Sequence, residues 1–396
     1  MAAGRAAEQG SRVLLLEKMG RVGVKLSLTG KGRCNLTNGG DLPTFIASFR
    51  HNGKFLYNVF SRFFNDDLFS FFTSRGLPLI EERGRRVFPA SNRAQDVVRV
   101  LRGYANSQGA KIRIHSPVRE ILADDRRIIG VRTDSGPFEA GKVILAAGGA
   151  SYPQTGSSGD GFKMAEKLGH TIQRIRPALV PLEVKEPYVR DLQGLGLKNV
   201  KIRLVSEGRK AGEEFGEMLF THFGVSGPII LTLSGLAVDR LPSDRVDLSI
   251  DFKPALSPEQ VEARLAREFQ RHNRKQILNI LPTLLPRRMI PIFIQKSGIS
   301  PAIKGNEVRS DERKRLMHLI KDWRLTVTSP RPIEEAIITA GGVSVQEIHP
   351  STMESKIIPG LHFCGEIIDV DGKTGGYNLQ AAFSTGWVAG EASVRR

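Results

Sequence analysis

The chain has few cysteines, no long apolar run and no recognisable leader segment. Cys34 and Cys364 are the only cysteines among its 396 residues, and no Cys-x-x-Cys pair occurs. This excludes a disulfide framework and a cysteine zinc cluster, counts against a redox-active disulfide, and suits a reducing compartment. No run of 18 or more apolar residues is present, and the N-terminus lacks the basic-then-apolar pattern of a signal peptide. We therefore expect a cytoplasmic protein with no membrane span and no metal site.

Acidic residues are too few to balance the basic ones. The chain has 58 Lys and Arg against 41 Asp and Glu, a formal net charge of +17, and residues 255–325 hold 15 basic and 7 acidic side chains. Such a charge favours polyanions or anionic small molecules without identifying the partner. We expect a solvated face or a dock for an anionic cofactor rather than a nucleic-acid interface. The composition does not determine the oligomeric state.

The N-terminal segment has the order of elements found in the second half of a dinucleotide-binding βαβ unit. Residues 1–9 are alanine-rich and predict a helix that ends at Gly10. Residues 13–16 form a continuous apolar run, typical of a parallel strand buried on both faces. Glu17 follows directly, at the point where an acidic side chain accepts hydrogen bonds from a ribose hydroxyl. The glycine fingerprint that precedes the helix in such a unit is not in the chain.

The remaining chain alternates between strand-like and helical regions. Phenylalanines between residues 55 and 72 recur near helical spacing and predict a core-facing stripe. Ser257-Pro258-Glu259 has the N-cap, proline and early acid of a helix start, and a helical pattern continues to Trp323. Strands are expected at 111–114, 118–122, 128–133 and 143–147, then at 200–206, 218–221, 229–233 and 246–252, and finally from Ile337 and at 361–364.

The strand-like run at 143–149 ends in paired glycines. Gly148 and Gly149 would let the backbone approach a bound group closely, although a tight turn explains the pair equally well. The segment therefore indicates a cofactor contact only together with other motifs.

The segment GKGRCNLTN at 30–38 is more specific. Gly32, Arg33 and Asn35 could place donors along a pyrophosphate and a flavin edge, and the alternative is a polar surface loop. Cys34 is expected to be a buried thiol, with a redox or catalytic role as the alternative.

The segment at 360–390 carries the strongest pattern. A strand ends at Gly365-Glu366, a loop with Asp369 follows, and Gly375-Gly376 opens an alanine-rich helix. The free N–H groups and positive dipole end of that helix would favour the negative charge that collects at N1 and O2 of a reduced flavin. This favours a flavin over a nicotinamide. The alternative is a glycine-capped helix that packs in the core and binds no ligand.

Together these segments resemble the BaiN/RdsA family of NAD(P)/FAD-dependent oxidoreductases, which includes aminoacetone oxidase-like flavoproteins. The resemblance is carried by LLLEK at 14–18, GKGRCNLTN at 30–38, LAAGGASYPQTGSSGDG at 145–161, LFTHFGVSGP at 219–228, AGGVSVQEIHPSTMESK at 340–356 and GLHFCGEIIDVDGKTGGYNLQ at 360–380. It implies an α/β fold with a Rossmann-like, discontinuous FAD-binding domain at 1–175 and 341–396. A β-barrel-like substrate domain would comprise 176–254 plus 325–340, and a helical subdomain would comprise 255–324.

The resemblance also implies FAD as the cofactor. Glu17 would hold the adenosine ribose, Val118 would lie beside the adenine, and Glu366 and Asp369 would face the ribityl and pyrophosphate region. The expected cofactor contacts are Glu17, Lys18, Lys25, Gly32, Arg33, Cys34, Asn35, Val118, Ala147, Gly148, Gly149, Gly365, Glu366, Asp369, Gly375, Gly376, Tyr377, Asn378 and Leu379.

The expected activity is transfer of a hydride or electron pair between a small organic substrate and FAD N5, with oxygen or NAD(P)H as the external partner. His222 is the candidate acid or base, although a lone histidine beside glycines is as often structural. The expected substrate contacts are Thr221, Phe223, Ser226 and Gly227. No second nucleotide fingerprint is visible, so NAD(P)H would bind transiently. The alternatives are a basic RNA-associated flavoprotein and a flavin-binding protein without turnover.

One departure from the family concerns the beginning of the chain. Family members have a strand and Gly-x-Gly-x-x-Gly before the alanine-rich helix, and Met1 aligns just beyond the third glycine. We therefore expect that the native start lies upstream of Met1, with a damaged or apo-like product as the alternative, and that the 396-residue chain binds FAD weakly.

Overall fold

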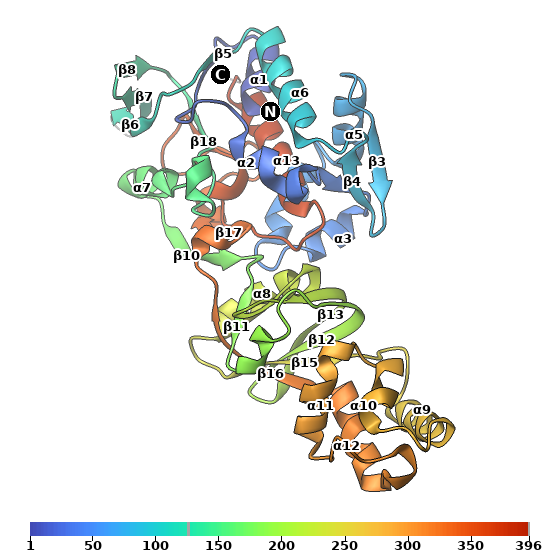
Figure 1. Ribbon diagram of the computed structural model, residues 1–396. Coiled ribbons are helices and arrows are strands. Elements are labelled where there is room, and N and C mark those ends of the chain that lie inside the picture. The colour runs from blue at the N-terminus through green and yellow to red at the C-terminus, as the bar shows by residue number, and fades with distance from the viewer. Residues whose placement is uncertain (125–126, 395–396) are drawn as a thin grey trace. The chain divides into compact units, whose positions relative to one another are not determined.

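The computed structural model describes residues 1–124 and 127–394, and the chain divides into two compact units. Unit 1 comprises Met1–Pro177 and Ile333–Arg396, and unit 2 comprises Ala178–Pro332. Unit 1 is therefore built from both ends of the chain, and unit 2 is inserted between its halves (Figure 1).

Two short parallel sheets lie in unit 1. One pairs β1 (Leu14–Leu16) with β5 (Lys111–Arg113), and the other pairs β9 (Val143–Leu145) with β18 (Leu361–Phe363). Parallel neighbours need long crossover connections, and here β18 returns from the last segment of the chain to lie beside β9. The carboxyl ends of β9 and β18 consequently meet at one edge.

The strand predicted at 13–16 is present but less buried than expected. Leu14 keeps 40% of its surface exposed, and Leu15 and Leu16 are half-buried. Within the described residues β1 pairs only with β5, so its other edge has no neighbouring strand to cover these side chains. The prediction of burial on both faces was therefore wrong.

The other strands of unit 1 form small antiparallel sheets. They are β2 (Thr37–Asn38), β3 (Leu79–Glu82) and β4 (Arg86–Pro89) in one sheet, β6 (Val118–Asp124), β7 (Arg127–Thr133) and β8 (Gly136–Glu139) in another, and the pair β10 (Ile172–Ala178) and β17 (Ile338–Val343). The helices are α1 (Ala2–Glu8), α2 (Val24–Leu28), α3 (Leu42–Ala47), α4 (Tyr57–Phe60), α5 (Asn65–Thr73), α6 (Ala94–Ser107), α7 (Asp160–Lys167) and α13 (Tyr377–Ala392).

The phenylalanine stripe packs in the core of unit 1, as its spacing predicts. Phe60, Phe63 and Phe72 are buried, and the ring of Phe63 stacks on Trp387 of α13 with centroids 4.5 Å apart. Phe69 is the exception, with 38% of its surface exposed, because it lies on the solvent face of α5. The stripe thus anchors the C-terminal helix that opens at the glycine pair.

Unit 2 contains a closed antiparallel barrel. Its strand order is β11-β14-β13-β12-β15-β16, and closure leaves no strand edge unpaired. The strands are β11 (Leu182–Val184), β12 (Gly196–Ser206), β13 (Arg209–Phe220), β14 (Gly224–Ser226), β15 (Val246–Asp251) and β16 (Trp323–Pro330).

The strand expected at 229–233 is instead part of helix α8 (Pro228–Arg240). Gly227 has a φ of 98° and Pro228 occupies the first helical turn, so the backbone turns sharply into a helix. The apolar run faces the barrel with Ile230 and Leu233 buried. A short apolar run does not distinguish a buried helix from a strand.

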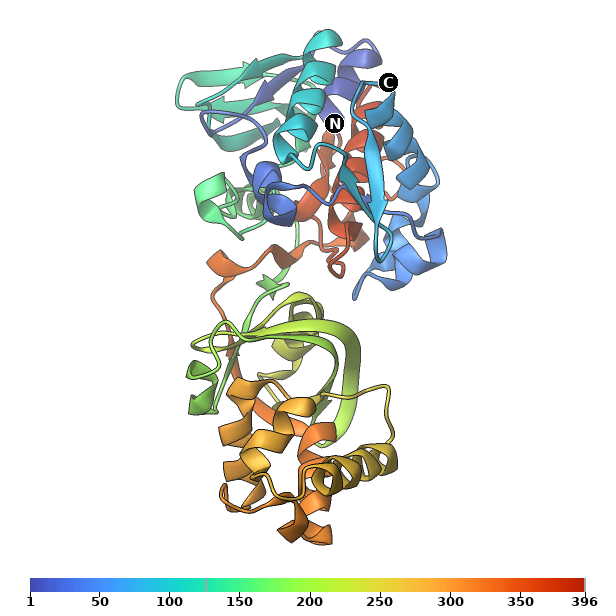
Figure 2. The same cartoon turned by 45° about the vertical axis from the view of Figure 1, so that its right-hand side comes forward.

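Four α-helices lie between β15 and β16. They are α9 (Pro258–Arg271), α10 (Ile277–Ile280), α11 (Ile290–Ser297) and α12 (Ser310–Lys321) (Figure 2). The predicted start of α9 is confirmed, because Ser257 Oγ accepts from the Gln260 N–H at 3.2 Å and Gln260 Oε1 accepts from the Ser257 N–H at 2.9 Å. None of the described helices is both long and apolar enough to span a bilayer.

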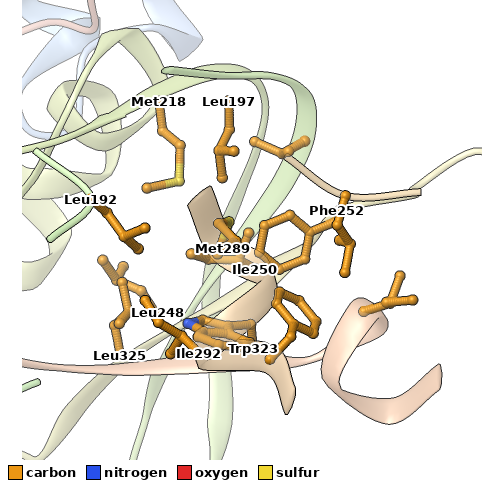
Figure 3. Close-up of a cluster of buried hydrophobic side chains, with 14 of the residues drawn as sticks. Leu192, Leu197, Met218, Leu248, Ile250, Phe252, Met289, Ile292, Trp323 and Leu325 are labelled. Carbon is orange, nitrogen blue, oxygen red and sulfur yellow. The ribbon is translucent and has the colours of Figure 1, made fainter. Parts of the chain in front are cut away.

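The helices and the barrel of unit 2 share one apolar core. Trp323 and Phe293 are fully buried with ring centroids 4.4 Å apart, and Phe252 packs edge-on against both. Figure 3 shows this cluster with Leu248, Met289 and other aliphatic side chains around the indole. Barrel and helices therefore stabilise each other.

Candidate functional site

The ends of β9 and β18 bring the two predicted glycine segments together. Ala147, Gly148 and Gly149 follow β9, and Gly365 and Glu366 follow β18. A Cβ atom on Gly149 would lie 2.2 Å from Thr339 Oγ1 and 2.9 Å from Glu366 Oε1. Only glycine fits there, so the pair serves close packing of backbone against polar side chains at this edge.

Glu366 is the centre of a polar network at the same edge. Lys25 Nζ donates to Glu366 Oε2 at 2.6 Å and to Ser151 Oγ at 2.8 Å. The other carboxylate oxygen, Oε1, accepts from the Thr339 N–H at 2.7 Å and from the Ser151 hydroxyl at 3.1 Å. Both side chains of the ion pair are 21% exposed, so solvent or a ligand reaches them. The network holds the carboxylate in a fixed orientation.

The N-terminus of α13 is held open by glycine. Gly376 has a φ of 100°, and a Cβ atom there would lie 2.3 Å from the Thr37 carbonyl oxygen. The helix has no side-chain cap, so the N–H groups of its first turn are offered to a ligand. With its amide oriented to suit its neighbours, Asn35 accepts from the Gly376 N–H at 3.0 Å. The structure thus brings the segment at 30–38 against the helix opening.

Three more predicted contacts lie on the first turn of α13. The Tyr377 ring meets Phe45 edge-on at 4.8 Å, and Leu379 packs against the apolar core. Asn378 accepts from the Gly372 N–H at 2.8 Å and donates to the Gly372 carbonyl at 2.9 Å. These side chains brace the first turn of the helix.

Arg33 and Cys34 have local partners that account for their positions. The Arg33 guanidinium pairs with Glu82, donates to Asn92 Oδ1 at 2.7 Å and lies over the Phe88 ring at 4.2 Å. Cys34 is completely buried, and this burial raises the pKa of its thiol to about 12, so it stays protonated at neutral pH. Gly32 is exposed beside them.

Glu17 and Lys18 lie at the carboxyl end of β1. Glu17 Oε1 accepts from the Met19 N–H at 2.8 Å, and Lys18 Nζ donates to Asp160 Oδ2 at 2.6 Å at the start of α7. Val118, the predicted adenine neighbour, is half-buried at the start of β6. Among the described residues, no donor forms a hydrogen bond with the other carboxylate oxygen of Glu17, Oε2.

Asp369 lines a polar hollow of about 330 Å³ in unit 1 together with His51, Asn52 and Arg176. Asn52 Nδ2 donates to its carboxylate Oδ2 at 2.9 Å and to its carbonyl at 2.8 Å. Burial and the neighbouring carboxylate of Asp371 raise the pKa of Asp369. The side chain is thus in an environment that disfavours its charged form.

The predicted substrate segment lies in unit 2, at the hairpin between β13 and β14. Thr221 Oγ1 accepts from the Gly224 N–H at 3.1 Å, and the Thr221 N–H donates to the Gly224 carbonyl at 2.9 Å. Phe223 lies under the Arg331 guanidinium at 4.6 Å, and Ser226 ends β14. Gly227 cannot carry a Cβ atom, which would lie 2.8 Å from Met218 Cα. Much of the THFGVSG pattern therefore has a structural explanation.

His222 occupies the tip of this hairpin. Its side chain is exposed, and its ring meets Phe223 edge-on with centroids 4.9 Å apart. Within residues 1–124 and 127–394, no carboxylate forms an ion pair with it.

Sequence patterns did not identify three of the polar residues at this site. Ser151 and Thr339 hold Glu366, and Asp160 pairs with Lys18. Ser151 follows the glycine pair by two residues and could have been found from that position. Thr339 comes from a distant strand and carries no local signal. In the part of the chain that the structure describes, no three His, Cys, Asp or Glu side chains cluster as a metal site.

The arrangement fits a flavin cofactor. Gly149 and Gly376 remove side chains where backbone approaches closely, and the uncapped start of α13 offers positive charge. Glu366, partly open to solvent, offers oxygens to hydroxyl groups. When bound, FAD supplies the redox chemistry, and these residues would bind and orient it.

Comparison with known proteins identifies the family. The HI0933-like protein Rossmann domain matches residues 1–392. The chain is 32% identical over 390 residues to the 3-dehydro-bile acid delta(4,6)-reductase of Clostridium scindens, covering 98% of this chain and 93% of the relative. It is 30% identical over 389 residues to the ribosomal RNA dihydrouridine synthase of Escherichia coli, with the same two coverages of 98% and 93%.

Solved structures agree at the level of the fold. The 3-ketosteroid delta1-dehydrogenase of Sterolibacterium denitrificans superposes with a TM-score of 0.52 at 12% identity, over 99% of this chain and 96% of that one. The 3-ketosteroid-delta4-(5alpha)-dehydrogenase of Rhodococcus jostii gives a TM-score of 0.51 at 15% identity, over 100% and 94%. With the whole-chain family match, these findings show that the chain belongs to the HI0933-like family and is an FAD-dependent oxidoreductase.

Proposed function

We propose that the chain reduces a carbon–carbon double bond conjugated to a carbonyl group in a small organic substrate, with FAD N5 as the hydride donor. The uncapped N-terminus of α13 carries the proposal, because its N–H groups favour the negative charge of a reduced flavin. The relatives supply the substrate chemistry. Reduction of a 3-dehydro-Δ4,6 bile acid and formation of dihydrouridine both add hydrogen across a double bond conjugated to a carbonyl.

The protein side chains would have separate tasks in this reaction. Reduction places a hydride on the carbon remote from the carbonyl and a proton on the adjacent carbon. We assign the role of proton donor to His222, since it is the exposed titratable residue of the predicted substrate segment. Thr221 and Ser226 carry hydroxyl groups that could bind the carbonyl oxygen. Lys25 and Glu366 would orient the cofactor.

The electrons would come from NADH or NADPH that binds transiently. No second dinucleotide fingerprint is visible in the sequence, so a permanently bound donor is not expected. Oxygen is the competing partner, and it would make the protein an oxidase instead. Mixing the oxidised protein with NADH or NADPH, and the reduced protein with oxygen, distinguishes a reductase from an oxidase.

A second candidate is the same chemistry on uracil carried in RNA. The net charge of +17 favours a polyanionic substrate, and two relatives are named ribosomal RNA dihydrouridine synthases, from Escherichia coli and Haemophilus influenzae. The reaction at the flavin would be unchanged, because uracil also has a double bond conjugated to a carbonyl.

Anaerobic single-turnover reduction tests the proposal. The FAD-loaded chain is photoreduced and mixed with a 3-keto-Δ4,6 steroid, a uracil-containing RNA, or oxygen. We expect rapid flavin reoxidation by the steroid or the RNA, with a product that has gained two hydrogens by mass spectrometry. His222→Gln should slow this step, while photoreduction itself is unchanged. Reoxidation by oxygen alone would refute a reductase, and a flavin inert to every partner would indicate binding without turnover.

A further inference from the structure

A row of basic side chains lies on helix α9 and on the turn that follows it, without an acidic partner among the described residues. Arg267 and Arg271 are four residues apart on α9, so they share a face, and Arg274 and Lys275 follow in the turn after the helix ends at Arg271. All four are exposed, and no ion pair joins any of them to an acidic side chain within residues 1–124 and 127–394. The opposite face of α9 is buried in the core of unit 2. The row therefore faces solvent.

The row is extended at both ends by further cations. The Lys275 carbonyl accepts from the Gly305 N–H at 3.0 Å, and the backbones of Lys304 and Gln276 pair in an isolated antiparallel β-bridge. The exposed Lys304 therefore lies beside the turn after α9. At the other end Arg264 is half-buried and close to Lys253. Burial and then the charge of Arg264 lower the pKa of Lys253. Like charges held this close destabilise each other unless an anion lies between them.

We propose that this surface, defined by Arg264, Arg267, Arg271, Arg274, Lys275 and Lys304, binds the phosphodiester backbone of RNA. The inference deepens the second candidate function and rests on it for the identity of the polyanion. Residues 264 to 271 rise about 10 Å along α9, and Arg274 and Lys275 extend the surface past its end, which is long enough to contact successive phosphates. Guanidinium groups bind phosphate oxygens through paired hydrogen bonds, and four of the six side chains are arginines.

The surroundings of the surface distinguish RNA from a membrane. Peripheral membrane binding combines basic residues with apolar side chains that insert into the bilayer. The exposed large hydrophobic side chains of the described residues all lie outside 253–324. Exposed aromatic rings are also missing from this surface, so base stacking is not available. The contacts would be made to phosphates and would not depend on base sequence.

Charge-matched variants test the proposal. Arg267→Gln/Arg271→Gln/Arg274→Gln removes three unpaired cations from the surface. The control Lys201→Gln/Arg203→Gln/Lys210→Gln removes three cations that share Glu213 on the barrel. Both triples have the same net charge. Binding of a fluorescein-labelled oligouridylate to the FAD-loaded chain is measured by anisotropy over a salt series, with circular dichroism as the check on folding.

The α9 triple should reduce the slope of log affinity against log salt by about 2, because each phosphate contact to a single strand contributes about 0.7. The control triple should change the slope by less than about 0.5. Equal slopes for the two triples, absence of RNA binding by the parent chain, or α9-dependent binding to phosphatidylserine vesicles without RNA binding would each overturn the proposal. Single-turnover reduction of the steroid is measured in the same variants. If the parent chain does not reduce the steroid, the proposed reductase activity is refuted. An α9-dependent salt slope in the same experiment would still support RNA docking.

Discussion

The two units bury their residues in different ways. In unit 2 a closed barrel and its helices share one continuous apolar core around Trp323. In unit 1 the strands form small separate sheets, and polar side chains such as Ser151, His170 and Gln380 are buried among them. A closed barrel satisfies the backbone hydrogen bonds of its own edge strands. In unit 1, the edge where β9 and β18 end is held together by side-chain hydrogen bonds and by glycines that allow close backbone packing. Unit 2 therefore gains its stability from packing, and we expect a bound cofactor to add to the stability of unit 1.

The largest effect is expected from Phe293→Ala in unit 2. Phe293 is fully buried against Trp323, so its removal leaves a cavity and should lower the free energy of unfolding of unit 2 by about 3–5 kcal/mol. In a Trp387→Phe background, Trp323 is the single tryptophan and its fluorescence follows the denaturation of unit 2. Phe215→Ala, at a residue 53% exposed, should cost less than about 0.5 kcal/mol. Similar losses in the two variants would contradict a packing-dominated unit 2.

The next effect is expected at the helix opening of unit 1. Gly376→Ala places a Cβ atom 2.3 Å from the Thr37 carbonyl at a φ of 100°, and the strain should be about 1–3 kcal/mol. We expect loss of bound flavin, measured as flavin absorbance per protein after purification with added FAD. The matched control is Gly103→Ala in α6, where nothing lies within 4 Å of the new atom. Full flavin occupancy in Gly376→Ala would show that the cofactor does not use this opening.

A smaller effect is expected from the ion pair of Lys25 and Glu366. A double-mutant cycle with Lys25→Met and Glu366→Gln should give a coupling free energy of about 1 kcal/mol, because both side chains are mostly shielded from solvent. The exposed pair of Arg119 and Asp134, with side chains 60% and 58% exposed, should give less than about 0.5 kcal/mol. The cycle is measured by thermal unfolding followed by Trp387 fluorescence in a Trp323→Phe background. Equal coupling in the two cycles would mean that the network at Glu366 is no more than a surface contact.

The last effect is a pH dependence of the stability of unit 1, which is absent at pH 7 and appears only as the pH falls. His170 lies between Glu347 at 3.2 Å and Ser355 at 2.9 Å, and burial lowers its pKa, as it also lowers the pKa of His362. The unfolded chain then takes up protons first as pH falls. The stabilisation is complete above the ordinary histidine pKa of about 6.5 and is lost as pH decreases below it, by at most about 1.4 kcal/mol per pH unit for each histidine.

The measurement is the free energy of unfolding of unit 1 between pH 7 and pH 5, followed by Trp387 fluorescence in the Trp323→Phe background. His170→Gln should flatten the profile, and His170→Gln/His362→Gln should flatten it further. An unchanged slope in the double variant would assign the pH dependence to other groups.

Strands and helices with strong local signals were predicted well from the sequence. The capping box at Ser257 and the strand before Gly365 are where the pattern places them. The apolar run at 229–233 was misread, because its conformation depends on the turn at Gly227 and on packing against the barrel. Burial of Leu14 was overestimated, because burial depends on neighbouring strands, which local sequence does not specify.

The site shows the same division. The sequence by itself determined the family, the flavin and the glycines at which backbone approaches backbone, because these depend on residue type at fixed spacing. Only the tertiary structure decided that Thr339 and Ser151 hold Glu366, that Arg33 pairs with Glu82, and that Arg267 and Arg271 of α9 have no acidic partner among the described residues. Hydrogen bonds and ion pairs between residues that are 27 to 215 positions apart depend on which chain segments pack together, and no local pattern encodes that.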